Sequence, residues 1–341
     1  MTPWRAFTNR GPQIENINPK KIMTKLLPAW MALMAALAAA SSAQAVEPLR
    51  VGINSWPGYQ PLRLADEIKG WEKNGIIHIE QFASSSQTLA AFRAGTLDAA
   101  ALTLDEALRL LEEKIPVRVI LVMDFSNGAD AILGRPGIKK FSGLAGKRIG
   151  VEKSAVGGYM IMRALEKHGM KPAQVQTVPI AFDAHENAFT SGQVDAVVTF
   201  EPVRTRLLKA GAVELFGSGE IPREITDVLV VREQTARKRF RVLKTLVDGW
   251  FAAIDYKEDN PEEAMSRLAG LMGIPVQAAK DGFMGLQLPS ARVNMELLAG
   301  DNPALKKPMF MLIRVMHDGG MLKSPPPVGG ILTGEFLPPA P

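Results

Sequence analysis

One stretch of this sequence occurs twice, and the spacing of its two copies constrains the fold. Residues 92–103 read FRAGTLDAAALT, and residues 189–200, 97 positions further on, read FTSGQVDAVVTF. In each copy an aromatic residue and a glycine end a helix, and a short apolar run then forms a buried parallel strand. Asp98 and Asp195 lie in the turns between them, and we interpret both as structural. Because solenoid repeats are only roughly 20 to 50 residues long, this repeat predicts two α/β lobes of similar construction.

The residues that follow each repeated strand are the first candidates for a binding site. In open parallel sheets, ligands bind beyond the carboxyl ends of the strands. These ends are residues 103–106, which read TLDE, and residues 199–202, which read TFEP. Glu106 stands three residues after Thr103, as in a capping box, so we interpret Glu106 as structural. The other polar residues at these ends remain binding candidates.

The pattern of strands and helices predicts that the chain passes between the two lobes twice. The crossings are expected near residues 124–133 and 221–227. Residues 216–222 are predicted to form a loop, and residues 183–186 resemble a second capping box. The predicted organisation is a signal peptide at 1–45, the first part of lobe 1 at 46–127, lobe 2 at 128–224, the returning strand and C-terminal helices of lobe 1 at 225–323, and a Pro-rich tail extended over the surface at 324–341.

The N-terminal residues predict export to the periplasm. A basic region precedes an apolar run from Leu26 to Ala40, and AQA at residues 43–45 is typical of a cleavage site for signal peptidase. The apolar run is shorter than the roughly 20 residues that a membrane-spanning helix needs. Met23 is an alternative start of translation. We therefore expect a secreted protein whose signal is cleaved after Ala45 and which has no lipid anchor.

Charge and cysteine content exclude several classes of protein. The formal net charge of +5 falls to +1 without residues 1–45, since 35 basic and 34 acidic residues remain. This balance does not indicate a nucleic acid partner. The sequence has no cysteine, which excludes disulfides, thiolate catalysis and anchoring through an acylated cysteine.

No pattern of catalytic or metal-binding residues is found. The four histidines, at positions 78, 168, 185 and 317, do not have the spacing of metal ligands, and no Gly-x-Ser-x-Gly motif occurs. We expect no metal, no cofactor and no catalysis. The polar residues at successive strand ends instead predict a binding site, because two lobes that close about a hinge would bring them around one small molecule. These residues are Ser55, Ser84, Ser86, Thr103, Asp105, Asp124, Ser154, Asp183 and Glu201.

The sequence resembles the nitrate/sulfonate/taurine-type solute-binding proteins of ABC importers, within the superfamily that includes the thiamine-pyrimidine synthase-like proteins. The resemblance covers about residues 49–260. It rests on the sequences VGINSWPGYQPL at 51–62, GTLDA at 95–99, DFSNGAD at 124–130, LAGKRIG at 144–150, GQVDA at 192–196 and EP at 201–202.

The resemblance implies the type II periplasmic binding fold, which is an α/β fold with two lobes. Each lobe would be a mostly parallel sheet flanked by helices, and the C-terminal region would be helical. The family captures a small solute between the lobes and delivers it, as a monomer, to an ABC permease at the inner membrane. The residues that match the family's cleft positions are Ser55, Trp56, Tyr59, Ser84, Ser86, Thr103, Asp124, Ser154, Val156 and Glu201.

The charge of the ligand is left open by the sequence. Serines and helix N-termini suit nitrate or a sulfonate, but acidic residues would repel an anion if several of them faced the cleft. We hypothesise a ligand with an amine, or a heteroaromatic ring with NH donors, stacked on Trp56 or Tyr59. The acidic residues concerned are Asp105, Asp124, Glu152, Asp183 and Glu201.

Two alternative functions belong to other classes. One is an extracytoplasmic sensor subunit that reports ligand occupancy to a kinase. The other is an enzyme of thiamine-pyrimidine or menaquinone metabolism with a related fold. The absence of the cysteine-rich motif of the thiamine-pyrimidine synthases argues against the first of these enzymes.

Overall fold

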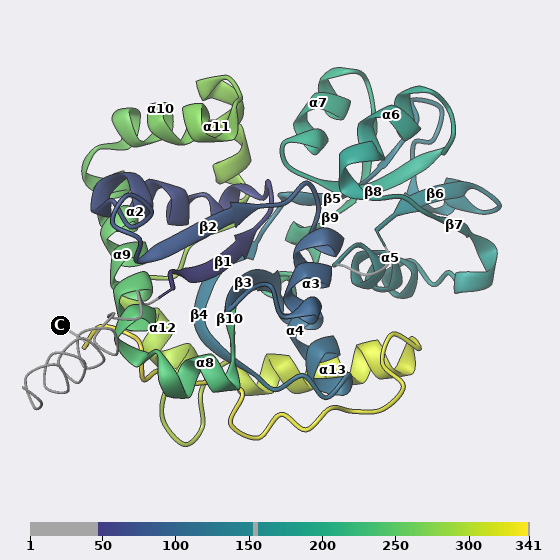
Figure 1. Ribbon diagram of the computed structural model, residues 1–341. Helices are drawn as coiled ribbons and strands as arrows, with labels where there is room; N and C mark the ends of the chain where they lie inside the picture. The colour runs from purple at the N-terminus through teal and green to yellow at the C-terminus, as the bar shows by residue number, and fades with distance from the viewer. Residues whose placement is uncertain (1–46, 153–155, 340–341) are drawn as a thin grey trace, which may run out of the picture. The chain divides into compact units, whose positions relative to one another are not determined.

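Two β-sheets flanked by helices make up the described part of this computed structural model, residues 47–152 and 156–339 (Figure 1). The predicted signal peptide and Ser154 lie outside these residues. Of the described helices, none is long and apolar enough to cross a membrane.

The first sheet has the strand order β11-β4-β10-β3-β1-β2. Strand β1 pairs in parallel with β2 and β3, whereas β10 is inserted antiparallel between β3 and β4. The strands β3 and β4 are buried along their whole length or nearly so, as expected of a sheet covered on both faces. The strands are β1 (Leu49–Ile53), β2 (Ile77–Gln81), β3 (Ala99–Thr103), β4 (Val117–Ser126), β10 (Thr226–Arg232) and β11 (Leu286–Gln287).

The second sheet has the strand order β7-β6-β8-β5-β9. Strand β6 pairs in parallel with β7 and β8, and β5 pairs antiparallel with β8 and β9. In each sheet one antiparallel strand is inserted between two others: β10 lies between β3 and β4, and β5 lies between β8 and β9. The short edge strand β11 is also antiparallel to β4. The strands are β5 (Asp130–Gly134), β6 (Arg148–Val151), β7 (Gln176–Pro179), β8 (Ala196–Phe200) and β9 (Val213–Gly217).

Helices connect the parallel strands of each sheet, and six more follow β10 (Figure 1). The long helix α9 has buried apolar side chains at helical spacing and packs on α2, while α13 packs on α4. The helices are α2 (Pro61–Lys69), α3 (Ser85–Ala94), α4 (Leu104–Glu112), α5 (Val156–Lys167), α6 (His185–Thr190), α7 (Val203–Lys209), α8 (Glu233–Lys238), α9 (Phe240–Asp259), α10 (Pro261–Met272), α11 (Val276–Met284), α12 (Ala291–Leu298) and α13 (Lys306–Asp318).

The repeated stretch forms the same structure twice. Gly95 and Gly192 have left-handed backbone angles, with φ of 82° and 85°, just before the turns into β3 and β8. Such angles favour glycine, which has no Cβ. In the turns, Asp98 accepts a hydrogen bond from the backbone N–H of Arg50 at 2.9 Å, and Asp195 accepts one from that of Arg148 at 3.0 Å. The structural interpretation of both aspartates is confirmed.

Three local predictions are corrected by the structure. The segment 216–222 is not wholly a loop, because β9 extends to Gly217 as an edge strand beside β5. Asp183 does not cap α6, whose N-cap is Ala184. At α4, by contrast, Glu106 accepts the backbone N–H of Thr103 at 3.0 Å, as predicted for its role in a capping box. The tail does not simply lie on the surface: its apolar side chains at 331, 336 and 337 are buried, and it forms a bridge to β4. Apolar burial outweighs the extended bias of its prolines.

Candidate functional site

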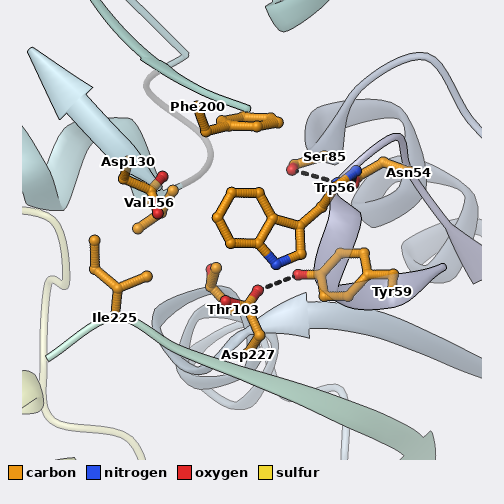
Figure 2. Close-up of a pocket in the computed structure, with 10 residues that line it drawn as sticks. All are labelled: Asn54, Trp56, Tyr59, Ser85, Thr103, Asp130, Val156, Phe200, Ile225 and Asp227. Carbon is orange, nitrogen blue, oxygen red and sulfur yellow. Dashed lines mark hydrogen bonds between the residues drawn. The ribbon is translucent and has the colours of Figure 1, made fainter. Parts of the chain in front are cut away.

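A narrow pocket with about 10 Å³ of free space is lined by side chains that come from both sheets and from the segments next to them (Figure 2). The first sheet contributes Thr103 at the end of β3 and Asp227 on β10. The second sheet contributes Asp130 at the start of β5 and Phe200 at the end of β8. The lining residues are Asn54, Trp56, Tyr59, Ser85, Thr103, Asp130, Val156, Phe200, Ile225 and Asp227.

The indole of Trp56 lies in the middle of the lining, with Phe200 against it (Figure 2). The two rings meet edge to face, with their centroids 5.5 Å apart and an interplanar angle of 80°. The turn after β1 holds the indole in place, because the backbone N–H of Trp56 donates to Asn54 Oδ1 at 2.8 Å. The indole Nε1–H donates to Asp124 Oδ2 at 3.1 Å. One hydrogen bond of its backbone and one of its indole therefore fix Trp56.

Tyr59 and two aspartates form a buried group beneath the indole. The Tyr59 hydroxyl donates to Asp227 Oδ1. Asp227 stands directly opposite Asp124 across the antiparallel pair of β10 and β4. Burial raises the pKa of Asp124 to about 7 and raises the pKa of Asp227 well above its ordinary value, with Asp124 as the second cause. Two neighbouring carboxyl groups that avoid carrying charge together hold at least one proton near neutral pH.

Asp130 supplies a carboxyl group to two neighbouring cavities. Its side chain is 3% exposed, and it lines both the main pocket and an adjoining recess formed with Glu152 and His185. Burial raises the pKa of Asp130 to about 7, although a hydrogen bond with Ser126 opposes this shift. Burial also lowers the pKa of His185 to about 4, so this imidazole is neutral at pH 7. Acidic groups therefore set the charge of the lining.

A hydrogen bond joins Glu152, which lines the recess, to the start of α3. The backbone N–H of Ser86, in the first turn of α3, donates to Glu152 Oε1 at 3.0 Å. Glu152 directly follows β6 and is 5% exposed. The N-terminus of α3 thus binds a carboxylate of this chain.

Four of the predicted site residues line the pocket together: Trp56, Tyr59, Thr103 and Val156. Asp124 lies behind the lining and holds the indole of Trp56. Thr103 and Val156 come from different sheets, so the structure brings residues from both lobes to one place.

Other predicted residues have local structural contacts. Ser84 is the N-cap of α3, because its hydroxyl accepts the backbone N–H of Gln87 at 3.2 Å. Glu201 accepts the backbone N–H of Thr205 at 3.1 Å and bonds to Arg204 at 3.0 Å, so its carboxylate binds the start of α7.

The remaining three predicted residues line neither the main pocket nor the adjoining recess. Asp183 is exposed on a short 3-10 helix. Asp105 is 3% exposed in the first turn of α4, and burial raises its pKa. Ser55 is half-buried in the turn after β1.

The structure adds six lining residues that sequence reasoning did not select. Phe200 was within reach of that reasoning, because it stands 97 positions after Thr103 and so occupies the same place in the repeat. Asp130 and Asp227 could also have been selected from the sequence, because each is an acidic residue in an apolar strand, where burial of a charge costs free energy. The six are Asn54, Ser85, Asp130, Phe200, Ile225 and Asp227.

The acidic residues do not form a metal centre. Within residues 47–152 and 156–339, no group of three or more histidine, cysteine, aspartate or glutamate side chains is arranged to hold a metal ion. The site therefore consists of aromatic rings, buried carboxyl groups and small polar side chains.

The chain is similar to known binding proteins. It is 29% identical over 259 residues to the taurine-binding periplasmic protein of Escherichia coli (strain K12), which covers 71% of this chain and 78% of that protein. The alkanesulfonate-binding protein SsuA from Xanthomonas axonopodis pv. citri, solved with bound MOPS, matches with a TM-score of 0.70 at 19% identity, over 84% of this chain and 98% of that one.

The same fold also occurs in an enzyme. The desulfurization enzyme DSZB matches with a TM-score of 0.60 at 19% identity, over 85% of this chain and 97% of that one. A likeness at this identity shows the fold alone.

The model of the NMT1-like family matches residues 42–272, which is more than half of the chain. Together with the taurine-binding relative and the two mixed sheets, this match confirms the predicted resemblance and the α/β periplasmic-binding-protein fold. The chain belongs to the NMT1-like family.

Proposed function

We propose that this chain is the solute-binding component of an ABC-type importer. It acts in the periplasm, binds one small molecule between its two sheets and delivers that molecule, as a monomer, to a membrane permease. The main support is the pocket itself, because its buried lining combines Trp56 and Thr103 from one sheet with Asp130 and Phe200 from the other. A ligand that touches both sets of residues stabilises the closed arrangement of the lobes.

The relatives indicate the size class of the solute. In this structure the pocket has about 10 Å³ of free space, roughly the room of one water molecule, so a solute enters it when the two lobes move apart. The relatives are named for taurine and alkanesulfonates, which are small molecules. We therefore propose a solute of the taurine-like class, with few non-hydrogen atoms.

Binding without turnover is supported by how the polar groups are used. The Trp56 and Tyr59 donors are bonded to Asp124 and Asp227, and the nearby His185 bonds to Thr199 Oγ1 and the Ile180 carbonyl, both at 3.2 Å. The sequence contains no cysteine that could act as a nucleophile. These groups hold the walls of the pocket, and we infer that they do not perform chemistry.

Thermal unfolding of the purified protein tests this function. A panel of taurine, alkanesulfonates, nitrate, amino acids, polyamines and pyrimidines is added, each at several concentrations. A solute at a hundred times its Kd stabilises the fold by about 2.7 kcal/mol, which raises the Tm by several degrees. Mass spectrometry of the recovered solute distinguishes binding from turnover. Conversion of the solute by catalytic amounts of protein would replace this proposal with an enzyme.

A further inference from the structure

Buried carboxyl groups gather around the pocket and keep oxygen atoms without hydrogen-bond partners among the described residues. All of these side chains are at most 5% exposed. A buried polar atom without a partner costs free energy, so a cluster of them calls for an explanation. The atoms are Asp105 Oδ2, Asp130 Oδ2 and Glu152 Oε2, whereas the carboxyl groups of Asp124 and Asp227 bond to each other.

Two members of this cluster line the main pocket, Asp227 and Asp130. The Asp227 carboxyl group accepts the Tyr59 hydroxyl. Figure 2 shows the Asp130 carboxyl group beside Val156, across the pocket from the Tyr59 side of the lining. Its position is fixed, because β5 pairs Asp130 with Phe200 in register and its backbone N–H donates to Ser126 Oγ at 3.2 Å. Its Oδ2 therefore offers a free acceptor to whatever occupies the pocket.

No cationic side chain lines the main pocket or the adjoining recess among the residues that the structure describes. The nearest guanidinium that acts on Asp130 belongs to Arg204, which bonds to Glu201 at 3.0 Å and to Glu214 at 2.7 Å. The strong side-chain donors of the lining, Trp56 Nε1–H and the Tyr59 hydroxyl, are bonded to carboxyl groups. An anion entering here would find no cationic side chain and few free donors.

The aromatic wall has the opposite preference. Trp56 and Phe200 form adjoining faces of the pocket, and Phe182 stacks behind Phe200 with centroids 3.9 Å apart. Aromatic faces attract cations through their quadrupoles, by roughly 0.5–2 kcal/mol according to solvation. A group with positive charge and several N–H donors thus complements both the rings and the carboxyl oxygens.

We propose that the solute carries an ammonium or amidinium group which binds the carboxylate of Asp130 and lies against the indole of Trp56. This inference rests on the proposed solute-binding function and names the chemical class of its ligand. The N–H groups of the cation donate to Asp130 Oδ2, and its charge compensates the buried acidic cluster. Sulfonate-only solutes are excluded from this position.

Matched probes test the proposal by isothermal titration of the full chain. Taurine is compared with isethionate, in which a hydroxyl replaces the ammonium, and butylamine is compared with butanesulfonate. Each ammonium probe is expected to bind at least 10-fold more tightly than its partner. D130N is expected to weaken the ammonium probes by about 10- to 100-fold, the range for a hydrogen bond to a charged group, and to leave the sulfonates unchanged or tighter. D183N, at an exposed position, is the matched control and is expected to change nothing.

The outcomes separate this proposal from the solute-binding function. Equal or tighter binding of isethionate or butanesulfonate overturns the cation site and leaves a solute-binding protein. Unchanged binding of taurine and butylamine to D130N overturns it as well. If no amine among these probes or in the wider panel binds, the cation-site proposal is wrong. If no compound of the whole panel binds, the proposed solute-binding function is wrong as well. The Tm of ligand-free D130N shows that the variant is folded, since the amide keeps the shape of the buried side chain.

Discussion

Thr103 and Phe200 occupy the same position in the two copies of the repeat, and both side chains reach the same pocket. One residue later the copies diverge. Leu104 begins α4 and is buried, whereas Glu201 carries a carboxylate that binds the first turn of α7. The repeat thus determines where each strand ends and how its turn is built. The residues just beyond the strand differ, because the first copy has a buried leucine there and the second has a carboxylate that binds the helix start.

The largest expected effect comes from removing the ring at the second strand end. Phe200→Ala deletes a side chain that is 6% exposed and stacked on Phe182, so we expect a loss of about 3–5 kcal/mol in the free energy of unfolding. The repeat-related Thr103→Val keeps its volume and is expected to cost about 1 kcal/mol or less. Urea denaturation measures both. Met284→Ala, at a side chain 78% exposed, is the control. Equal losses of unfolding free energy in the Thr103 and Phe200 variants would contradict the expected difference between the two strand ends.

The second prediction concerns pH and Asp130. Its pKa is about 7 in the folded protein and about 4 when unfolded, so the native state holds the extra proton between these values. Stability from this group therefore falls as pH rises, by about 2 kcal/mol between pH 5 and 7. Burial is the main cause, and Asp105 and Glu201 act with it, whereas Ser126 and Arg204 oppose it.

Unfolding of the parent and of D130N at pH 5, 6, 7 and 8 measures this contribution. Because Asp124 titrates in the same range, the relevant quantity is the difference between the two proteins. We expect the parent to lose stability relative to D130N as pH rises. A difference that stays constant across the series would show that Asp130 remains ionised in the fold.

The third prediction separates capping from ligand binding at the second strand end. Glu201→Gln weakens the bonds to Thr205 and Arg204, so we expect a loss of about 1–2 kcal/mol in stability with ligand affinity changed less than twofold. Glu186→Gln removes an exposed ion pair with Arg206 and is expected to cost less than about 0.5 kcal/mol. A tenfold loss of ligand affinity in E201Q would show that Glu201 takes part in ligand binding.

The smallest effects are expected in the two turns that are alike. Asp98→Asn and Asp195→Asn each weaken one bond to a backbone N–H and the pairing with an arginine, so each is expected to cost about 1 kcal/mol. The Arg148 hydrogen bond lowers the pKa of Asp195. The stability that ionised Asp195 contributes is therefore present above about pH 4 and is lost as pH falls. Acid titration of D195N should show a flatter loss than the parent, and a cost differing severalfold between the two variants would break the equivalence of the turns.

Much of the fold was predictable because it depends on local chemistry. Gly95 and Gly192 were recognised as helix ends, and both have the left-handed angles that favour glycine. The repeat predicted two similar α/β units, and the structure has two sheets with a parallel pairing at each repeated strand. The tail was harder to predict, because burial of the side chains at 331, 336 and 337 depends on surfaces made by distant segments.

The sequence by itself determined the α/β class, the turns at Asp98 and Asp195, and the strand ends near which a pocket forms. Only the tertiary structure decided which side chains line it. Strands β5 and β10 are buried on both faces, so no alternation in polarity reveals the direction in which Asp130 and Asp227 point. The contact of Trp56 with Phe200 joins positions from different sheets, and no local pattern encodes it. Long-range packing brings these rings and carboxyl groups together, and it gives the pocket its charge.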